Sequence, residues 1–176
     1  GRIPLDIESG LGFSDGRHPT TQLCVRAIEA LYTQETGLDT VADIGTGTGI
    51  LSLVAGALGA QEITATDIDD IARQAARSHF ERQLTTIPYR VVSTIPTGTP
   101  HDLVLGNLYL GVLVGLAAQI SSWTRPQGWC ILSGFTKTES ADVIAVFEQF
   151  GFRFHTCHEA GQWVAITLQK QTVRGS

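Results

Sequence analysis

The stretch VADIGTGTGILSL, residues 41–53, decides the fold that this sequence predicts. It begins as a short apolar run that ends at Asp43. Gly45, Gly47 and Gly49 follow, and the residues after them have helical spacing. Glycine tolerates positive φ and lets a ligand approach the backbone where a Cβ would collide. Such turns at the carboxyl ends of parallel strands are where open α/β sheets bind ligands. The stretch therefore predicts a strand, a binding loop and a helix.

The rest of the chain alternates between strand and helix signals, which favours one α/β domain with a mostly parallel sheet and helices on both faces. The last two strands are expected to form an antiparallel hairpin around a turn at residues 159–161. Thr20 or Thr21 is a candidate N-cap for the first helix. Residues 94–100 are rich in turn formers and too short for a helix of normal length. Helices are expected from residue 21 and over 50–58, 70–83, 110–123 and 139–150, and strands over 40–43, 62–67, 89–93, 101–107, 129–134, 152–157 and 163–168.

Composition and charge narrow the range of functions and partners that the sequence allows. The 176 residues suit a single domain, and the formal net charge is -5 with only 12 scattered Lys and Arg residues. No basic stripe is available for a phosphate backbone, so duplex nucleic acid is not an expected partner. No apolar run is long enough for a membrane span. The chain contains no Met, and whether a segment precedes Gly1 stays open.

The cysteines give no sign of a disulfide framework or a metal site. Cys24, Cys130 and Cys157 are an odd number without CxxC spacing, and Cys130 lies in an apolar run where a small buried thiol is usual. Reduced thiols agree with a cytoplasmic setting. We therefore expect structural cysteines, no bound metal and a cytoplasmic protein.

The glycine loop distinguishes between two classes of cofactor. Dinucleotide sites favour G-x-G-x-x-G/A, in which a small third residue lets the helix meet the pyrophosphate. Counting from Gly45, that third position is Ile50, so the dinucleotide template fails. The form D-x-G-x-G-x-G instead fits S-adenosylmethionine, which has no phosphates. Asp43 is expected to face the ammonium group of this cofactor directly or through water.

Asp67 is the expected partner of the cofactor's ribose. It lies 22 residues after Gly45, at the tip of the adjacent strand, where a carboxylate can accept hydrogen bonds from both ribose hydroxyls. The alternative is that the glycines form a plain turn and that Asp67 caps the following helix. Asp69 and Asp70 are better candidates for that cap.

With the loop and its acid placed, other stretches resemble the PrmA-type ribosomal protein methyltransferases, a family of class I S-adenosylmethionine enzymes. The resemblance covers about residues 11–170, and Trp163 also matches. It implies a Rossmann-like, seven-stranded, mostly parallel sheet of order 3-2-1-4-5-7-6. The stretches that carry it are GFSDGRHPTTQLC at 12–24, similar to FGTG-x-HPTT; DIGTGTGILSL at 43–53 and ATDID at 65–69; HDLVLGNLYLGVL at 101–113; and RPQGWCILSGF at 125–135.

The resemblance also implies a set of site residues and a division of the chain. An arm of residues 1–20 would cover the cofactor, residues 21–170 would form the methyltransferase domain, and residues 171–176 would be a flexible tail. His18 is expected to hydrogen-bond the arm together. Residues expected to bind the cofactor are Thr20, Thr21, Asp43, Gly45, Thr46, Gly47, Gly49, Asp67, Ile68 and Asn107; Leu108 and Tyr109 are expected to bind the substrate.

Asn107 is the expected catalytic residue. Its carboxamide offers donors and an acceptor at the place where the methyl group should emerge. The alternative is an Asn that only forms a turn.

The sequence departs from the family pattern at three places. The GTG before HPTT reads SDG, with Arg17 where Thr is usual. The segment after the third strand is short and lacks the adenine-binding acid, for which Ser93 and Thr94 are weak substitutes. The N-terminal domain that recognises the ribosomal protein is absent from this chain, so the acceptor is not inherited from the resemblance.

The expected reaction is N-methylation of a protein or peptide amine, either a lysine side chain or an N-terminus. No motif fixes a general base, which is tolerable for an amine and harder for a hydroxyl. Two alternatives stay open. One is a methyltransferase for a small molecule or a tailored peptide, and the other is a non-catalytic cofactor-binding partner subunit. The number of methyl groups and the oligomeric state are not determined by the sequence.

Overall fold

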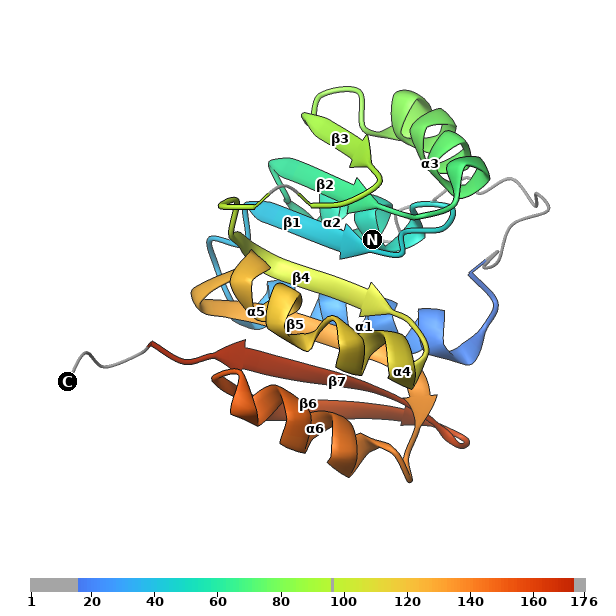
Figure 1. The fold of residues 1–176 in the computed structure, drawn as a ribbon. Helices are drawn as coiled ribbons and strands as arrows, with labels where there is room; N and C mark the ends of the chain where they lie inside the picture. Colours follow the sequence, from blue (N-terminus) through green and yellow to red (C-terminus); the bar gives the residue numbers. More distant parts are fainter. Residues whose placement is uncertain (1–15, 96, 173–176) are drawn as a thin grey trace.

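A seven-stranded sheet of order β3-β2-β1-β4-β5-β7-β6 forms the centre of the computed structural model, which describes residues 16–95 and 97–172 (Figure 1). β7 runs antiparallel to β5 and β6, while the pairs β1–β2, β1–β4, β2–β3 and β4–β5 are parallel. This confirms the predicted strand order and the C-terminal hairpin. The strands are β1 Thr40–Ile44, β2 Glu62–Thr66, β3 Tyr89–Val92, β4 His101–Asn107, β5 Thr124–Thr136, β6 Phe152–Ala160 and β7 Trp163–Lys170.

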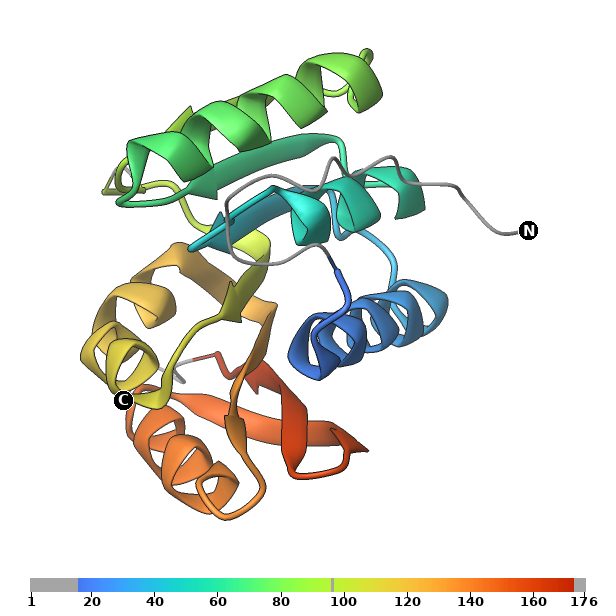
Figure 2. The same cartoon turned by 90° about the vertical axis from the view of Figure 1, so that its right-hand side faces the viewer.

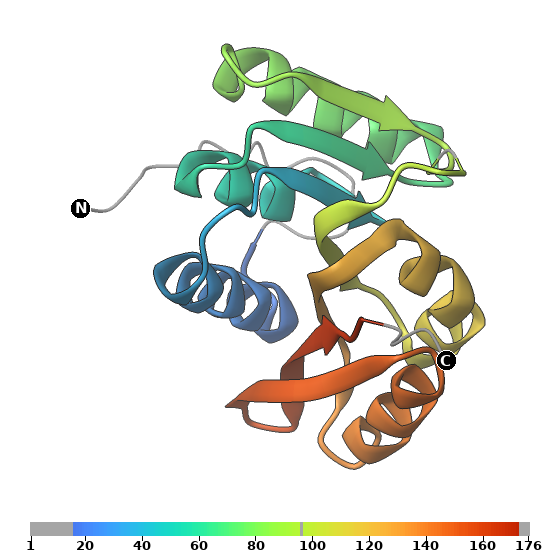
Figure 3. The same cartoon turned by 90° about the vertical axis from the view of Figure 1, so that its left-hand side faces the viewer.

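Helices cover both faces of the sheet, as predicted (Figures 2 and 3). Side chains alternate between the faces of a strand. In β4, Leu103 and Leu105 therefore pack in the apolar layer under α1, α2 and α3, whereas Val104 packs in the layer under α4, α5 and α6. The helices are α1 Pro19–Gln34, α2 Ile50–Leu58, α3 Asp70–Gln83, α4 Leu110–Gly115, α5 Ala117–Trp123 and α6 Ser140–Gln149.

The first helix begins earlier than predicted. The N-cap of α1 is His18, whose Nδ1 accepts a hydrogen bond from the backbone N–H of Thr20 at 3.3 Å. The expected cap at Thr20 or Thr21 is therefore wrong. Pro19 takes the first helical position, where its missing N–H removes no helix hydrogen bond.

The expected continuous helix over 110–123 is also wrong, because the chain forms α4 and α5 with a break at Leu116. Gly111 and Gly115 weaken the helix before the break. Leu113 and Ala117 are both fully buried, so the apolar spacing continues across the interruption and conceals it.

Several strand boundaries differ from those expected. β5 begins at Thr124 rather than at residue 129, and it passes through Gln127, whose φ of 64° is unusual for a residue with a side chain. β6 continues to Ala160, so the hairpin turn is Gly161 and Gln162 rather than 159–161. No helix forms among the described residues between β3 and β4, as predicted.

Cys24 and Cys130 are buried free thiols, and Cys157 is a partly buried one. Most of the predicted arm, up to residue 15, and the tail from residue 173 lie outside the described residues. None of the helices in the described part of the chain combines the length and apolar character needed to cross a membrane.

Candidate functional site

The carboxyl ends of β1, β2 and β4 meet at one edge of the sheet (Figure 1). Ile44, the last residue of β1, pairs with Thr66 on one side and with Gly106 on the other. The next residues of the neighbouring strands are Asp67 and Asn107, which therefore flank the start of the glycine loop. This edge is the position where open α/β sheets bind ligands.

Backbone conformation explains why the loop contains three glycines. Gly45, Gly47 and Gly49 have φ values of 66°, 56° and 85°, in the left-handed region that side chains disfavour. The N–H of Thr46 donates to the carbonyl of Thr66 at 2.8 Å, and the N–H of Gly49 donates to the carbonyl of Thr46 at 2.9 Å. The loop is thus tied to β2 and folded onto itself.

Asp43 lies beneath this loop, with only 1% of its surface exposed. The hydroxyls of Thr46 and Ser52 both donate to its Oδ2 at 2.7 Å, which joins the loop to the first turn of α2. Burial raises the pKa of the Asp43 carboxyl, and the negative charge of Asp67 adds to the rise, whereas the two hydroxyls and the backbone N–H of Ser52 act in the opposite direction. Asp43 therefore shapes the loop from inside, and its contact with a cofactor ammonium group stays a prediction.

Asp67 is held in a fixed orientation by two backbone groups. Its Oδ2 accepts from the N–H of Gly47 and its Oδ1 from the N–H of Asp69, both at 3.0 Å. A carboxylate has about four acceptor positions, so both oxygens keep the capacity to accept a ribose hydroxyl. The N-cap of α3 is Asp69, whose side chain accepts from the N–H of Ile71 at 2.9 Å. The predicted cap at Asp69 is confirmed, and Asp67 is not the cap.

Ile68 follows directly, with 93% of its surface exposed. A large apolar side chain in solvent at the end of a sheet strand suits contact with a flat apolar ring. Ser93 and Thr94, the weak candidates for adenine binding, lie exposed just after β3, the neighbour of β2 in the sheet.

Thr21 and Asn107 meet in the structure although 86 residues separate them in the chain. Asn107 Nδ2 donates to Thr21 Oγ1 at 3.3 Å, so a residue expected to bind the cofactor and the expected catalytic residue lie together. Thr20 points elsewhere, because its hydroxyl lies 2.7 Å from His18 Nδ1. His18 thus bonds to its own segment, as predicted, and its ring packs edge-on against Trp163 with centroids 5.1 Å apart.

The two expected substrate residues lie in different environments. Leu108 packs over the loop so closely that a Cβ on Gly45 would collide with its Cδ2. Its backbone approaches Gly134 of β5 equally closely, which is why a glycine is required at that position. Tyr109 is 72% exposed. Leu108 therefore packs against the glycine loop, whereas Tyr109 is exposed and accessible to a partner.

Sequence reasoning missed a pair of residues on α3 that contact the loop. His79 is 3% exposed and Phe80 is fully buried, and they contact Thr48 and Gly49 respectively. Ser52 was also missed, although it holds Asp43. The one sequence signal that could have found His79 and Ser52 is that each is a polar residue at a helix position whose spacing predicts burial.

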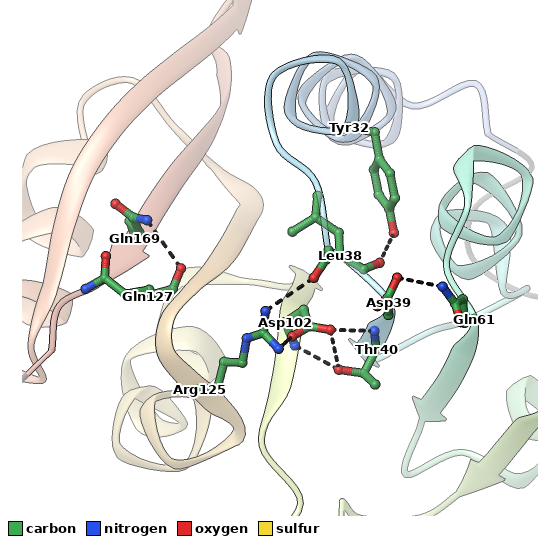
Figure 4. Close-up of polar contacts among 10 residues, drawn as sticks. Tyr32, Leu38, Asp39, Thr40, Gln61, Asp102, Arg125, Gln127 and Gln169 are labelled. Carbon is green, nitrogen blue, oxygen red and sulfur yellow. Dashed lines mark hydrogen bonds and ion pairs between the residues drawn. The ribbon is translucent and has the colours of Figure 1, made fainter.

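A second polar cluster lies at the opposite, amino-terminal end of the sheet (Figure 4). Asp102 Oδ2 accepts from the N–H and the hydroxyl of Thr40 at 2.8 Å each, and Arg125 forms an ion pair with the same carboxylate. Nearby, Tyr32 donates to the carbonyl of Leu38 at 2.9 Å. The contacts of Asp102 connect the amino-terminal ends of β1, β4 and β5, far from the glycine loop.

Among the described residues, no group of three or more His, Cys, Asp or Glu side chains is arranged to hold a metal.

Comparison with known proteins identifies the family. The profile of the family described as "Ribosomal protein L11 methyltransferase (PrmA)" matches residues 1–171. The chain belongs to the PrmA family. Its PrmA relatives include the ribosomal protein L11 methyltransferases of Hydrogenovibrio crunogenus and Geotalea daltonii, which are 34% and 33% identical. The matches cover 96% of this chain but only 56% and 57% of those two proteins, so the chain spans little more than half their length.

Solved structures agree with membership of the PrmA family. The ribosomal protein L11 methylase of Lactobacillus delbrueckii subsp. bulgaricus superposes with a TM-score of 0.81 at 28% identity, covering 96% of this chain and 86% of that chain. A methyltransferase from Pyrococcus furiosus superposes with a TM-score of 0.74 at 21% identity, covering 96% and 90%. The second likeness shows the shared fold alone.

Proposed function

We propose that this chain is the catalytic part of an S-adenosylmethionine-dependent methyltransferase that methylates an amine of a protein. The observation that carries the proposal is the convergence of the glycine loop, Asp67 and the Thr21–Asn107 pair at one edge of the sheet. The PrmA relatives are named for ribosomal protein L11, which makes that protein the first acceptor to test. Ribosomal proteins of bacteria work in the cytoplasm, and we place this chain there.

The residues at the sheet edge fit this cofactor and do not fit a nucleotide phosphate. The carboxyls of Asp43 and Asp67 accept from hydroxyls and backbone N–H groups, and the nearby guanidinium of Arg73 donates to the Asp67 carbonyl and is paired with Asp70. Such a site favours the cationic sulfonium and ammonium groups and disfavours a diphosphate. Asp67 would hold the ribose, the loop would receive the amino-acid end, and Ile68 would cover the adenine. S-adenosylmethionine supplies an electrophilic methyl group on sulfur when bound.

Asn107 would orient the accepting amine. Because Nδ2 donates to Thr21, the planar amide turns Oδ1 away from that bond, and an amide oxygen accepts from an amine N–H. Methyl transfer is a displacement along a line, so it depends on holding the nucleophile in the right place. The role of Asn107 is therefore orientation of the nitrogen, which reacts as a neutral amine after its ammonium form has released one proton to solvent.

The surface beside Asn107 favours a polypeptide acceptor over a small molecule. Residues 103–124 contain no charged side chain. Within this stretch, Tyr109, Val112 and Val114 are 72%, 45% and 39% exposed and begin two residues after Asn107. Exposed apolar groups beside a reactive site indicate a contact surface for another protein. We define these three residues as the α4 ledge.

Transfer of a radioactive methyl group tests the proposal. The chain is incubated with labelled S-adenosylmethionine and purified ribosomal protein L11, and Asn107→Ala is run in parallel. We expect label on an amine nitrogen, located by mass spectrometry, and a large loss of label with the variant. Methyl groups found only on oxygen or carbon contradict the proposed chemistry. Cofactor binding without transfer to this protein or to any component of a cell lysate favours the passive partner subunit.

A further inference from the structure

We infer that His79 is a positioning residue that fixes the glycine loop from α3 and thereby sets the affinity for the cofactor. The inference rests on the proposed function, because it takes the loop as the place where the cofactor binds. The observation behind it is a buried contact between the imidazole and a loop carbonyl, reaching across 31 residues of sequence.

The contact defines the protonation of the ring. His79 Nδ1 lies 2.7 Å from the carbonyl oxygen of Thr48, and the side chain is 3% exposed. A carbonyl oxygen only accepts hydrogen bonds, so Nδ1 must carry a proton. A peptide unit is planar, so fixing the Thr48 oxygen also fixes the N–H of Gly49. That N–H donates to the carbonyl of Thr46 at 2.9 Å, which closes the loop.

The residue after His79 holds the next residue of the loop. Phe80 is fully buried, and a Cβ placed on Gly49 would lie 2.5 Å from its Cε1 atom. One turn of α3 therefore contacts the loop by a hydrogen bond at Thr48 and by packing at Gly49. The same β2–α3 unit also holds Gly47, through Asp67 Oδ2 at 3.0 Å.

Gly47, Thr48 and Gly49 are thus all fixed by the β2–α3 unit. This ordering should affect the free energy of cofactor binding. Glycines have more backbone freedom to lose than other residues when they become ordered. A loop that is already ordered binds its ligand without that loss, which raises affinity. Removal of the His79 bond should therefore weaken cofactor binding and leave the rate at saturating cofactor nearly unchanged.

Calorimetric titration with S-adenosylhomocysteine, together with steady-state kinetics, tests this on the whole chain. In His79→Leu we expect the dissociation constant to rise about two- to twelvefold, the range for one neutral hydrogen bond. In His79→Asn the Nδ2 atom occupies the same position relative to Cγ as Nδ1, so we expect most of the affinity to return. His155→Leu, an exposed site on β6, is the control and should bind normally. Equal affinity in wild type and His79→Leu overturns the inference, as does a fall in kcat alone.

A measurement on the wild-type protein covers the case in which the leucine variant does not fold. Nitrogen NMR of the imidazole should show a protonated Nδ1 in both the free and the bound protein. An unprotonated Nδ1 overturns the inference, because no hydrogen bond to the Thr48 carbonyl could then exist. Failure of the proposed function looks different, since the wild-type chain would then not bind S-adenosylhomocysteine at all.

Discussion

Asn107 Nδ2 donates to Thr21 Oγ1 at 3.3 Å, and this single bond joins the end of β4 to the first turn of α1. Thr21 is 1% exposed, so the bond is shielded from water on the side of α1. The orientation of the Asn107 amide is therefore set by a residue of the HPTT segment. In this site the segment orients the group that should face the acceptor.

Replacing Thr21 tests that relationship. Thr21→Val keeps the shape of the side chain but removes the hydroxyl, so the Asn107 amide loses its partner. We expect kcat to fall about 10- to 100-fold, as for a misplaced reacting group. Thr33→Val on the exposed part of the same helix is the control and should keep full activity. Equal kcat in both variants would show that Thr21 does not orient the amide.

Asp67→Ala should weaken S-adenosylhomocysteine binding by about 1.5–3 kcal/mol, the range for hydrogen bonds to a charged group. The physical reason is the loss of an ionised acceptor whose orientation Gly47 and Asp69 fix. Calorimetric titration measures the change. Asp39→Ala, which removes a carboxylate at the opposite end of the sheet, is the matched control. Unchanged affinity in Asp67→Ala would place the ribose elsewhere.

Asp43→Asn should remove the contribution of one raised pKa to the pH dependence of the free energy of unfolding. The hydroxyls of Thr46 and Ser52 donate to Oδ2 and the backbone N–H of Ser52 also donates to the carboxyl, so the amide offers one acceptor oxygen to three donors. Burial raises the pKa of this carboxyl in the folded state above its ordinary value of 3.8. Ionisation of the carboxyl therefore destabilises the wild type above the raised pKa, and this destabilisation disappears as pH falls through the raised pKa.

The free energy of unfolding of the wild type should accordingly rise relative to that of Asp43→Asn as pH falls through the raised pKa towards the ordinary value of 3.8. Urea denaturation of both proteins across the acid range measures the difference. A difference that stays constant, or a wild type that becomes less stable relative to the variant towards acid pH, would mean that burial does not raise the pKa of this carboxyl.

Val112→Asp places a charge on the α4 ledge and should raise the KM for a protein acceptor. An exposed apolar contact of this kind contributes on the order of 1–2 kcal/mol to binding, or about five- to thirtyfold in KM. The KM for the cofactor should not change, because the ledge lies outside the glycine loop. Ala145→Asp, on the exposed face of α6, is the control. An acceptor KM that is unaffected by the charge on the ledge would argue for a small-molecule substrate.

Gly49→Ala should destabilise the fold through two effects. The residue has a φ of 85°, and the new Cβ would meet the ring of Phe80. Gly37→Ala is the matched control, because its φ is 74° but its Cβ would enter open space. We expect about 1–2 kcal/mol for the conformational cost in both variants and about 1–3 kcal/mol more for the collision in Gly49→Ala. Thermal and urea unfolding compare them, and equal losses would show that the ring moves aside freely.

The sequence could predict those site residues that lie together in short stretches of the chain. The loop and its acid were predicted from Asp43, the three glycines and Asp67, because a strand, a turn and a helix follow one another directly in the sequence. The contacts that orient these groups are distant in sequence. Thr21 meets Asn107 across 86 residues and His79 meets Thr48 across 31, and no local periodicity encodes either pair.

Local sequence patterns also gave wrong predictions where they report which side chains are buried but not how the backbone is folded. The apolar spacing of Leu113, Ala117 and Ile120 continues from α4 into α5, so a helix break at Leu116 leaves no mark in it. His18 replaced the expected threonine cap because an imidazole nitrogen can accept the same backbone bond. Both errors concern how an element begins or is interrupted, and neither changed the strand order or the placement of the site.

A cocrystal structure with S-adenosylhomocysteine tests the central claim most directly. The ribose hydroxyls should lie within hydrogen-bonding distance of the Asp67 carboxylate, and the sulfur should lie beside Asn107 with the amino-acid end over the glycine loop. A ligand bound at any other edge of the sheet, or a loop whose glycines face away from it, would contradict the account.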